Sequence, residues 1–208
     1  MNGVAPIWME HLRFAAVSDI GMRRLNNQDA ALQLPATDAD GWHSRGHLFL
    51  VADGMGAHAA GELASRMAVQ AVAHHYQKHL ELSPPEALLR AVQDANSEIY
   101  QRGQANAEFH NMGTTCSALL LLPQGALVGH VGDSRVYRFR ANKLEQLTFD
   151  HSLVWEMGHR EGESTESVSA IPKNVITRSL GPQPTVKVDV EGPFPFELGD
   201  TFLLCSDG

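Results

Sequence analysis

The 208-residue sequence predicts an α+β fold in a single domain spanning residues 1–208. Strand-like apolar runs come first, two consecutive helical patterns follow, and strand-like runs then return. This order lacks the strict strand–helix alternation of a parallel sheet, and it favours antiparallel sheets with helices grouped beside them. A chain of this length can bury a sizeable core without disulfides.

The first half of the chain is expected to hold two strands and two helices. Strand-like runs at Leu12–Ser18 and His47–Ala52 flank the polar loop Pro35–Gly46. Apolar residues at helical spacing predict a helix from residue 61 to about residue 80. A second helix should begin after Ser83, because Ser83-Pro84-Pro85-Glu86 is a capping box with proline at the first helical position.

The second half is expected to be mainly strand. The strand-like runs are Thr115–Leu122, Ala126–Val131, Arg135–Arg140, Val186–Val190 and Thr201–Ser206. Pro123-Gln124-Gly125 joins the first two runs and predicts a hairpin. Residues 150–172 show little periodicity and are interpreted as a mobile insertion.

Composition excludes several classes of protein. The 16 basic and 24 acidic residues give a net charge of −8, which argues against nucleic-acid binding because a phosphate backbone attracts clustered cations. The longest apolar stretch, Ala118–Leu122, is far shorter than a membrane span of about 20 residues. Cys116 and Cys205 lie in apolar runs and are interpreted as core residues. We therefore expect a cytoplasmic protein with no nucleic-acid or membrane partner.

Three apolar runs end in an aspartate beside a glycine, namely at Asp53, Asp133 and Asp207. A carboxylate at the end of a buried strand is costly unless it is paired. If the three ends meet, hard divalent ions such as Mg²⁺ or Mn²⁺ would balance the charge. The alternative is three ordinary turns, since Asp-Gly is a common turn dipeptide; Asp40-Gly41 is interpreted as only a turn.

Seven segments, in order, resemble the metal-dependent Ser/Thr protein phosphatases of type 2C (PPM) in their bacterial form. They run from about residue 14 to residue 208: SDIGMRRLNNQD, VADGMGAHAAGELAS, MGTTCSALLL, GHVGDSRVYRFR, LTFDHSLV, NVITRSLG and LLCSDG. The resemblance implies two antiparallel β-sheets packed as a β-sandwich, with helix pairs on the outer faces (α-β-β-α). It also implies a flap subdomain at about residues 150–172.

The resemblance further implies two or three Mn²⁺ or Mg²⁺ ions. Asp53 would bridge two ions, with the Gly54 carbonyl as an added ligand. Asp207 would bind the second ion, and Asp133 would help to hold a third. Asp29 would orient a metal-bound water from the second coordination layer.

Two further residues have roles that the resemblance implies for substrate. Arg24 would bind the substrate phosphate, with Arg23 as a second choice, although two arginines in a solvated loop are the alternative. His58 is the candidate proton donor to the leaving hydroxyl group. A hydroxide bridging the ions would attack phosphorus directly, so neither cysteine should be needed.

The expected function is hydrolysis of phosphoserine and phosphothreonine in proteins, by a monomer opposed by a eukaryotic-like Ser/Thr kinase. The alternative is a weak or inactive phosphatase-like module that binds phosphoproteins, because Gln28 and Met55 depart from the family pattern. Family members also continue past Ser-Asp-Gly to a late metal-binding aspartate. We therefore expect the C-terminal part of the domain to be missing, and this exact chain to be poor in metal and weakly active.

One histidine cluster stands apart from these motifs. His74, His75 and His79 fall within the first predicted helix, and the last two lie one turn apart. This spacing could bind Zn²⁺. A solvated helix face is the simpler interpretation of the sequence.

Overall fold

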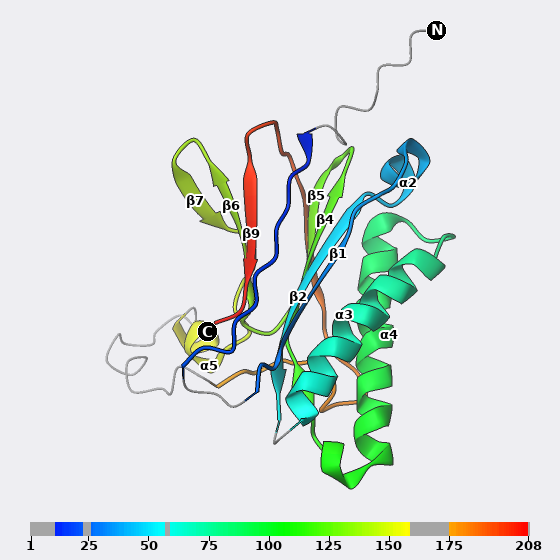
Figure 1. Ribbon diagram of the computed structural model, residues 1–208, viewed down its shortest axis with the longest axis vertical. Coiled ribbons are helices and arrows are strands. Elements are labelled where there is room, and N and C mark those ends of the chain that lie inside the picture. The colour runs from blue at the N-terminus through cyan, green and yellow to red at the C-terminus, as the bar shows by residue number, and fades with distance from the viewer. Residues whose placement is uncertain (1–10, 23–25, 57–58, 159–174, 208) are drawn as a thin grey trace, which may run out of the picture.

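Two antiparallel sheets are stacked face to face, and two long helices cover the outer face of the larger sheet (Figure 1). The computed structural model describes residues 11–22, 26–56, 59–158 and 175–207. The helices are α3 (Ala60–Lys78) and α4 (Pro84–Ala105). The predicted α+β sandwich is confirmed. The described residues contain this one long helix pair, on one outer face of the sandwich.

The larger sheet has the strand order β1-β2-β4-β5-β8, and β3 pairs with β2. Its strands are β1 (Asp29–Leu34), β2 (His47–Met55), β3 (Gly113–Thr114), β4 (Cys116–Leu122), β5 (Gly125–Val131) and β8 (Asp189–Phe194). The smaller sheet has the order β7-β6-β9. Its strands are β6 (Arg135–Arg140), β7 (Lys143–Gln146) and β9 (Thr201–Cys205).

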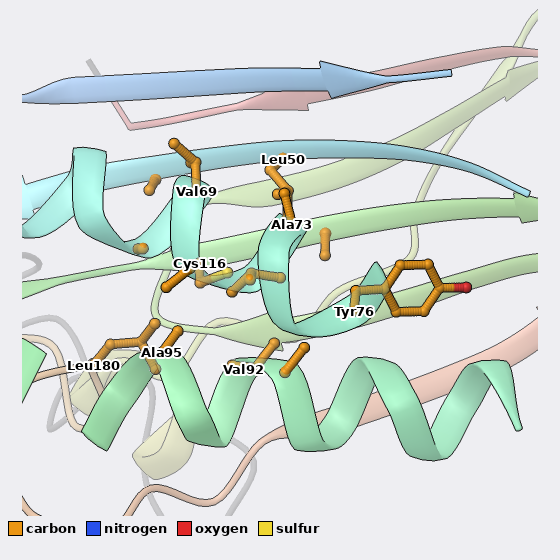
Figure 2. Packing of buried hydrophobic residues seen from close by; sticks show 14 of the residues in the cluster. Leu50, Val69, Ala73, Tyr76, Val92, Ala95, Cys116 and Leu180 are labelled. Carbon is orange, nitrogen blue, oxygen red and sulfur yellow. The ribbon is translucent and has the colours of Figure 1, made fainter. Parts of the chain in front are cut away.

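Small side chains on α3 and α4 allow the helices to lie close to each other and to the sheet. Alanines dominate the buried faces of both helices, and the interaxial distance of packed helices follows the size of the side chains between them. Figure 2 shows Val92 and Ala95 of α4 facing the layer that contains Leu50 and Cys116. Tyr76 is buried beside them, and its hydroxyl donates to the carbonyl of Arg45 at 2.8 Å.

A second apolar layer lies between the two sheets. Leu119 and Val128 of the larger sheet and Val136 of the smaller sheet belong to one buried cluster. Phe202 and Leu204 of β9 are partly buried against it. The two layers together fix the position of the strand ends that carry the candidate site.

The predicted helix start at Ser83 is confirmed. Its backbone N–H donates to Oε2 of Glu86 at 3.2 Å, and its hydroxyl donates to the same oxygen at 2.6 Å. The hairpin between β4 and β5 is also confirmed, with Leu122 opposite Gly125. In the described part of the chain, no helix is both long enough and apolar enough to cross a bilayer.

Several element predictions were wrong. Residues 12–18 form no strand; they line the cavity between the sheets. Strand β1 was missed because the polar segment before it was interpreted as a loop. The loop Pro35–Gly46 contains a short helix, α2 (Ala39–Ser44), capped by Asp38. The expected insertion begins with another, α5 (Leu153–Gly158); residues 159–172 lie outside the described part of the chain.

Candidate active site

Asp53 lies near the end of β2, directly opposite Asp29 of β1 in the sheet register. Its backbone N–H donates to Oγ1 of Thr115 at 2.8 Å. Its carbonyl accepts from the backbone N–H of Thr115 and from the hydroxyl of Thr114, both at 2.9 Å. Three hydrogen bonds from one strand end therefore hold the backbone of Asp53 in place.

Gly54 allows the next strand residue to pack against two other segments. A Cβ atom here would lie 2.0 Å from the carbonyl oxygen of Gly61 and 2.7 Å from that of Gln28. The Gly54 N–H donates to the same Gln28 carbonyl at 3.0 Å. Only glycine fits this contact, because any side chain would overlap the neighbouring backbone. Packing therefore requires glycine here, in addition to the expected role of its carbonyl as a metal ligand.

Asp29 and Asp207 come together from opposite ends of the chain. The hydroxyl of Ser206, which follows β9, donates to Oδ2 of Asp29 at 2.8 Å. Asp29, Asp53 and Asp207 all line one cavity of about 1330 Å³, which is bordered by β1, β2 and β9. The structure thus brings two of the three strand-end aspartates, and Asp29 with them, to one place.

Asp133 lies on the turn between β5 and β6, beside this group. Burial raises the pKa of Asp133, and the nearby charge of Asp207 raises it further. The turn is tied to β2 through Thr115, whose Oγ1 lies 2.6 Å from the hydroxyl oxygen of Ser134. The third strand-end aspartate therefore lies within the electrostatic reach of Asp207.

Arg135, two residues after Asp133, offsets the charge of that carboxyl only weakly, because its guanidinium pairs with a different carboxylate. Its guanidinium donates to both carboxylate oxygens of Asp150, at distances between 2.5 and 3.1 Å. This pairing raises the pKa of Arg135. The acidic group at Asp133 and Asp207 is left with like charges whose repulsion a cation would relieve.

The donor set fits hard divalent ions. Asp29, Asp53 and Asp207 line one cavity, Asp133 lies within the electrostatic reach of Asp207, and the donor atoms of all four side chains are oxygens. Oxygen donors of this kind suit Mg²⁺ and Mn²⁺ better than softer metals. The arrangement can hold ions beside a cavity wide enough for a substrate group.

The sequence-predicted residues for phosphate binding and proton donation lie outside the described residues. These are Arg24 with its neighbour Arg23, and His58. Gln28, which replaces a more common acidic residue of the family, donates from Nε2 to the carbonyl of Gly56 at 3.2 Å. It therefore bonds to the first residue after β2 and adds no charge.

Several residues that support this site were not predicted from the sequence. His151 is buried, its Nδ1 accepts from the backbone N–H of Gly132 at 3.0 Å, and its Nε2 lies 2.9 Å from Asp189. Burial lowers the pKa of His151, so the neutral ring holds the turn that carries Asp133. Thr115 also joins that turn to β2, because its Oγ1 bonds to the hydroxyl of Ser134 and accepts from the backbone N–H of Asp53. Polar residues flanking apolar strands were the available signal, but their partners depend on strand register.

Comparison with known proteins gives a consistent result. A model of the protein phosphatase 2C family matches residues 22–208. A serine/threonine phosphatase stp of Listeria monocytogenes is 40% identical over 167 residues, which cover 77% of this chain and 66% of that protein. Protein phosphatase PhpP of Streptococcus pneumoniae is 34% identical over 201 residues, covering 95% and 78%. The chain thus spans slightly less than two-thirds of the Listeria relative.

Solved structures show the same similarity. The serine/threonine phosphatase PstP/Ppp of Mycobacterium tuberculosis superposes with a TM-score of 0.77 at 32% identity, covering 94% of this chain and 78% of that one. The catalytic domain of serine threonine protein phosphatase PstP, solved in complex with two manganese ions, gives a TM-score of 0.72 at 31% identity, covering 94% and 77%.

Proposed function

Because this chain belongs to the protein phosphatase 2C family, we propose that it hydrolyses phosphoserine and phosphothreonine in proteins with the help of divalent metal ions. The observation that carries the proposal is the convergence of Asp29, Asp53 and Asp207 on one cavity, with Asp133 beside Asp207. A similar phosphatase domain solved with two manganese ions supports the dependence on metal.

The carboxylates have distinct roles in this proposal. Asp53 would hold Mn²⁺ or Mg²⁺ ions, with the Gly54 carbonyl as a further ligand. Asp207 would hold an ion as well, and Asp133 would help Asp207 to hold a further, third ion. Bound divalent ions lower the pKa of water and offset the charge of the phosphoryl group.

Other side chains position the reactants. Asp29, held by the hydroxyl of Ser206, orients the attacking water by accepting a hydrogen bond from it. Arg24 binds the non-bridging phosphate oxygens, because a guanidinium donates two parallel hydrogen bonds to such a group. His58 donates a proton to the leaving alkoxide of serine or threonine. The flap at about residues 150–172 borders the substrate.

We infer the biological setting from the same premise. The partners are phosphorylated proteins, with a eukaryotic-like Ser/Thr kinase as the opposing enzyme, and the domain acts as a monomer in the cytoplasm. The alternative of an inactive phosphoprotein-binding module is not favoured, because the relatives are named as phosphatases.

Substitution of Asp53 tests the proposal. Asp53→Asn should lower Mn²⁺-dependent hydrolysis of a phosphothreonine peptide by at least about 100-fold, since it removes charge between two ions. Asp40→Asn is the matched control, because Asp40 also precedes glycine but is exposed on α2. Circular dichroism checks that both variants fold. Equal activity of the Asp53 variant and the wild-type chain would contradict the proposal, and retained phosphopeptide affinity without turnover in the wild-type chain would favour the binding module.

A further inference from the structure

A second group of potential ligands lies on the outer helix layer, away from the strand ends. His75 of α3 and His79, the residue directly after α3, face Asp94 of α4, and one donor atom of each lies within 4.8 Å of the others. All three residues are partly buried between the helices. The sequence interpretation of a solvated helix face overlooked the contribution of α4.

The donor atoms converge on one oxygen of Asp94. Nε2 of His79 lies 2.9 Å from Oδ2 of Asp94, and Nδ1 of His75 lies 3.9 Å from the same atom. The other oxygen, Oδ1, lies 3.0 Å from Nε of Arg90 in an ion pair. The ion pair with Arg90 thus engages Oδ1, while Oδ2 is the oxygen near the two imidazole rings.

The outer nitrogen of each ring also faces a carboxylate. Nε2 of His75 lies 2.7 Å from Oε1 of Glu98, and Nδ1 of His79 lies 3.4 Å from Oε1 of Glu81. A metal-bound imidazole usually donates its other N–H to a carboxylate, which fixes the ring and raises its basicity. Both histidines thus have the outer partner typical of a metal ligand.

We propose that His75 Nδ1, His79 Nε2 and Asp94 Oδ2 form a site for a borderline divalent transition metal, with Zn²⁺ as its natural occupant. Two imidazoles and one carboxylate suit Zn²⁺, and three protein ligands leave a fourth position for water. The all-oxygen group at the strand ends suits harder ions, so the two sites differ in metal preference.

The two sites also lie at different places along α3. Ala60 begins the helix just after the loop that follows Gly54. His75 is 75 − 60 = 15 residues further on, which corresponds to about 23 Å along the axis. An ion at the outer site would cross-link α3 to α4 and stabilise the helix layer, without contact with the proposed catalytic group.

Zinc titration of the whole chain tests the proposal. The Asp53→Asn background weakens metal binding at the strand ends, so binding that remains reports on the outer site. Calorimetry should show one Zn²⁺ per chain, and Zn²⁺ should raise the melting temperature. His79→Gln should abolish both effects, whereas Glu98→Gln should weaken binding by about 10- to 100-fold because it removes an outer partner.

His74→Gln is the matched control. His74 is the neighbouring histidine on α3 and is exposed, so this variant should bind Zn²⁺ like its parent. Melting temperatures measured in chelator separate loss of metal from loss of folding. The proposal is overturned if His74→Gln and His79→Gln bind Zn²⁺ equally, or if the Asp53→Asn chain shows no saturable Zn²⁺ binding. In the latter case, the pairs His75–Glu98 and His79–Asp94 serve only as hydrogen-bonded contacts to α4.

Discussion

The hydroxyl of Ser206 lies 2.8 Å from Oδ2 of Asp29, and this hydrogen bond joins residues 177 positions apart in the sequence. Ser206 follows β9 of the smaller sheet, and Asp29 begins β1 of the larger sheet. The bond therefore connects the two layers of the sandwich at the candidate site. It also holds Oδ2 of Asp29 in place, and we propose that Asp29 orients the attacking water.

Removal of this hydroxyl should impair turnover more than substrate binding. Ser206→Ala should lower kcat by about 10- to 100-fold, the usual cost of losing an outer partner at a metal site. KM for a phosphopeptide should change little, because Ser206 is not assigned a contact with phosphate. Steady-state kinetics in Mn²⁺ would measure both values. Ser206→Thr, which keeps a hydroxyl, should restore part of kcat; no recovery would argue against the hydrogen bond as the cause.

Asp133→Asn should stabilise the chain in the absence of metal. Burial and the charge of Asp207 raise the pKa of Asp133. Its raised pKa means that the free energy of unfolding falls as pH rises through the pKa of Asp133 in the folded chain, because the ionised carboxylate is less favourable there than in the unfolded chain. For this half-exposed group the gain should be about 0.5–1 kcal/mol, or about 2 °C in Tm.

With Mn²⁺ present, the wild-type chain should be more stable than Asp133→Asn. Added Mn²⁺ should raise the Tm of the wild-type chain more than that of Asp133→Asn, because the variant has one carboxylate fewer to bind the ions. Thermal melts with chelator and with Mn²⁺ provide the comparison. An Asp133 variant that is less stable in chelator would mean that the carboxylate is not in a repulsive environment.

His47 should make stability depend on pH below neutrality. Burial lowers its pKa from 6.5 to about 4. Its Nδ1 accepts from the backbone N–H of Ala36 at 2.8 Å, a bond that protonation at this nitrogen would break. Between pH 6.5 and about pH 4, His47 takes up a proton in the unfolded chain but stays neutral in the folded chain. The free energy of unfolding should therefore fall by roughly 2–3 kcal/mol as pH drops through this range.

His47→Asn isolates this contribution. The Oδ1 atom of asparagine can accept from the same N–H but does not titrate. Urea unfolding at pH 7.5 and pH 5 should show a smaller loss of stability in the variant than in the wild-type chain. His130, whose pKa burial also lowers to about 4, contributes equally to both proteins. An identical pH dependence would exclude His47 as a source.

Gly54→Ala should destabilise the fold strongly. A Cβ atom would overlap the Gly61 carbonyl, which lies in backbone at the start of α3 and cannot rotate away. We expect a loss of at least about 3 kcal/mol, the upper end for overpacking a tight contact. Gly21→Ala is the control: nothing lies within 4 Å of its added Cβ, and its φ of +70° limits the cost to about 1 kcal/mol. Similar urea midpoints for the two variants would contradict the packing argument.

The sequence predicted the local features of this fold well. Helix α4 begins where the capping box predicts, because the backbone N–H and the hydroxyl of Ser83 both bond to the nearby Glu86 side chain. These contacts are local and need no partner from another element. Strand β1 was missed although Ala30, Leu32 and Leu34 alternate and pack on the core. The preceding run of polar residues obscured that alternation. Residues 12–18 form a mainly apolar, strand-like run, yet they lie along the cavity rather than within a sheet. An apolar run alone does not provide a partner strand.

The candidate site was predictable in its acidic residues but not in its supports. Asp53, Asp133 and Asp207 share a strand–Asp context that is visible in the sequence. The bonds from Thr115 to Asp53 and from His151 to Gly132 depend on which strands are neighbours and in what register. Those relationships arise from tertiary packing, for which a single sequence contains no direct signal.

The proposed metal ligands belong to both layers of the sandwich. Asp53 is in the larger sheet, Asp207 follows the smaller one, and Asp133 lies where the chain passes from one sheet to the other. Any sliding of one sheet over the other would alter the spacing of these oxygens. The affinity for ions should therefore depend on how the two sheets are aligned. A substitution that loosens the apolar layer between the sheets, far from any carboxylate, would release the ions before the chain unfolds.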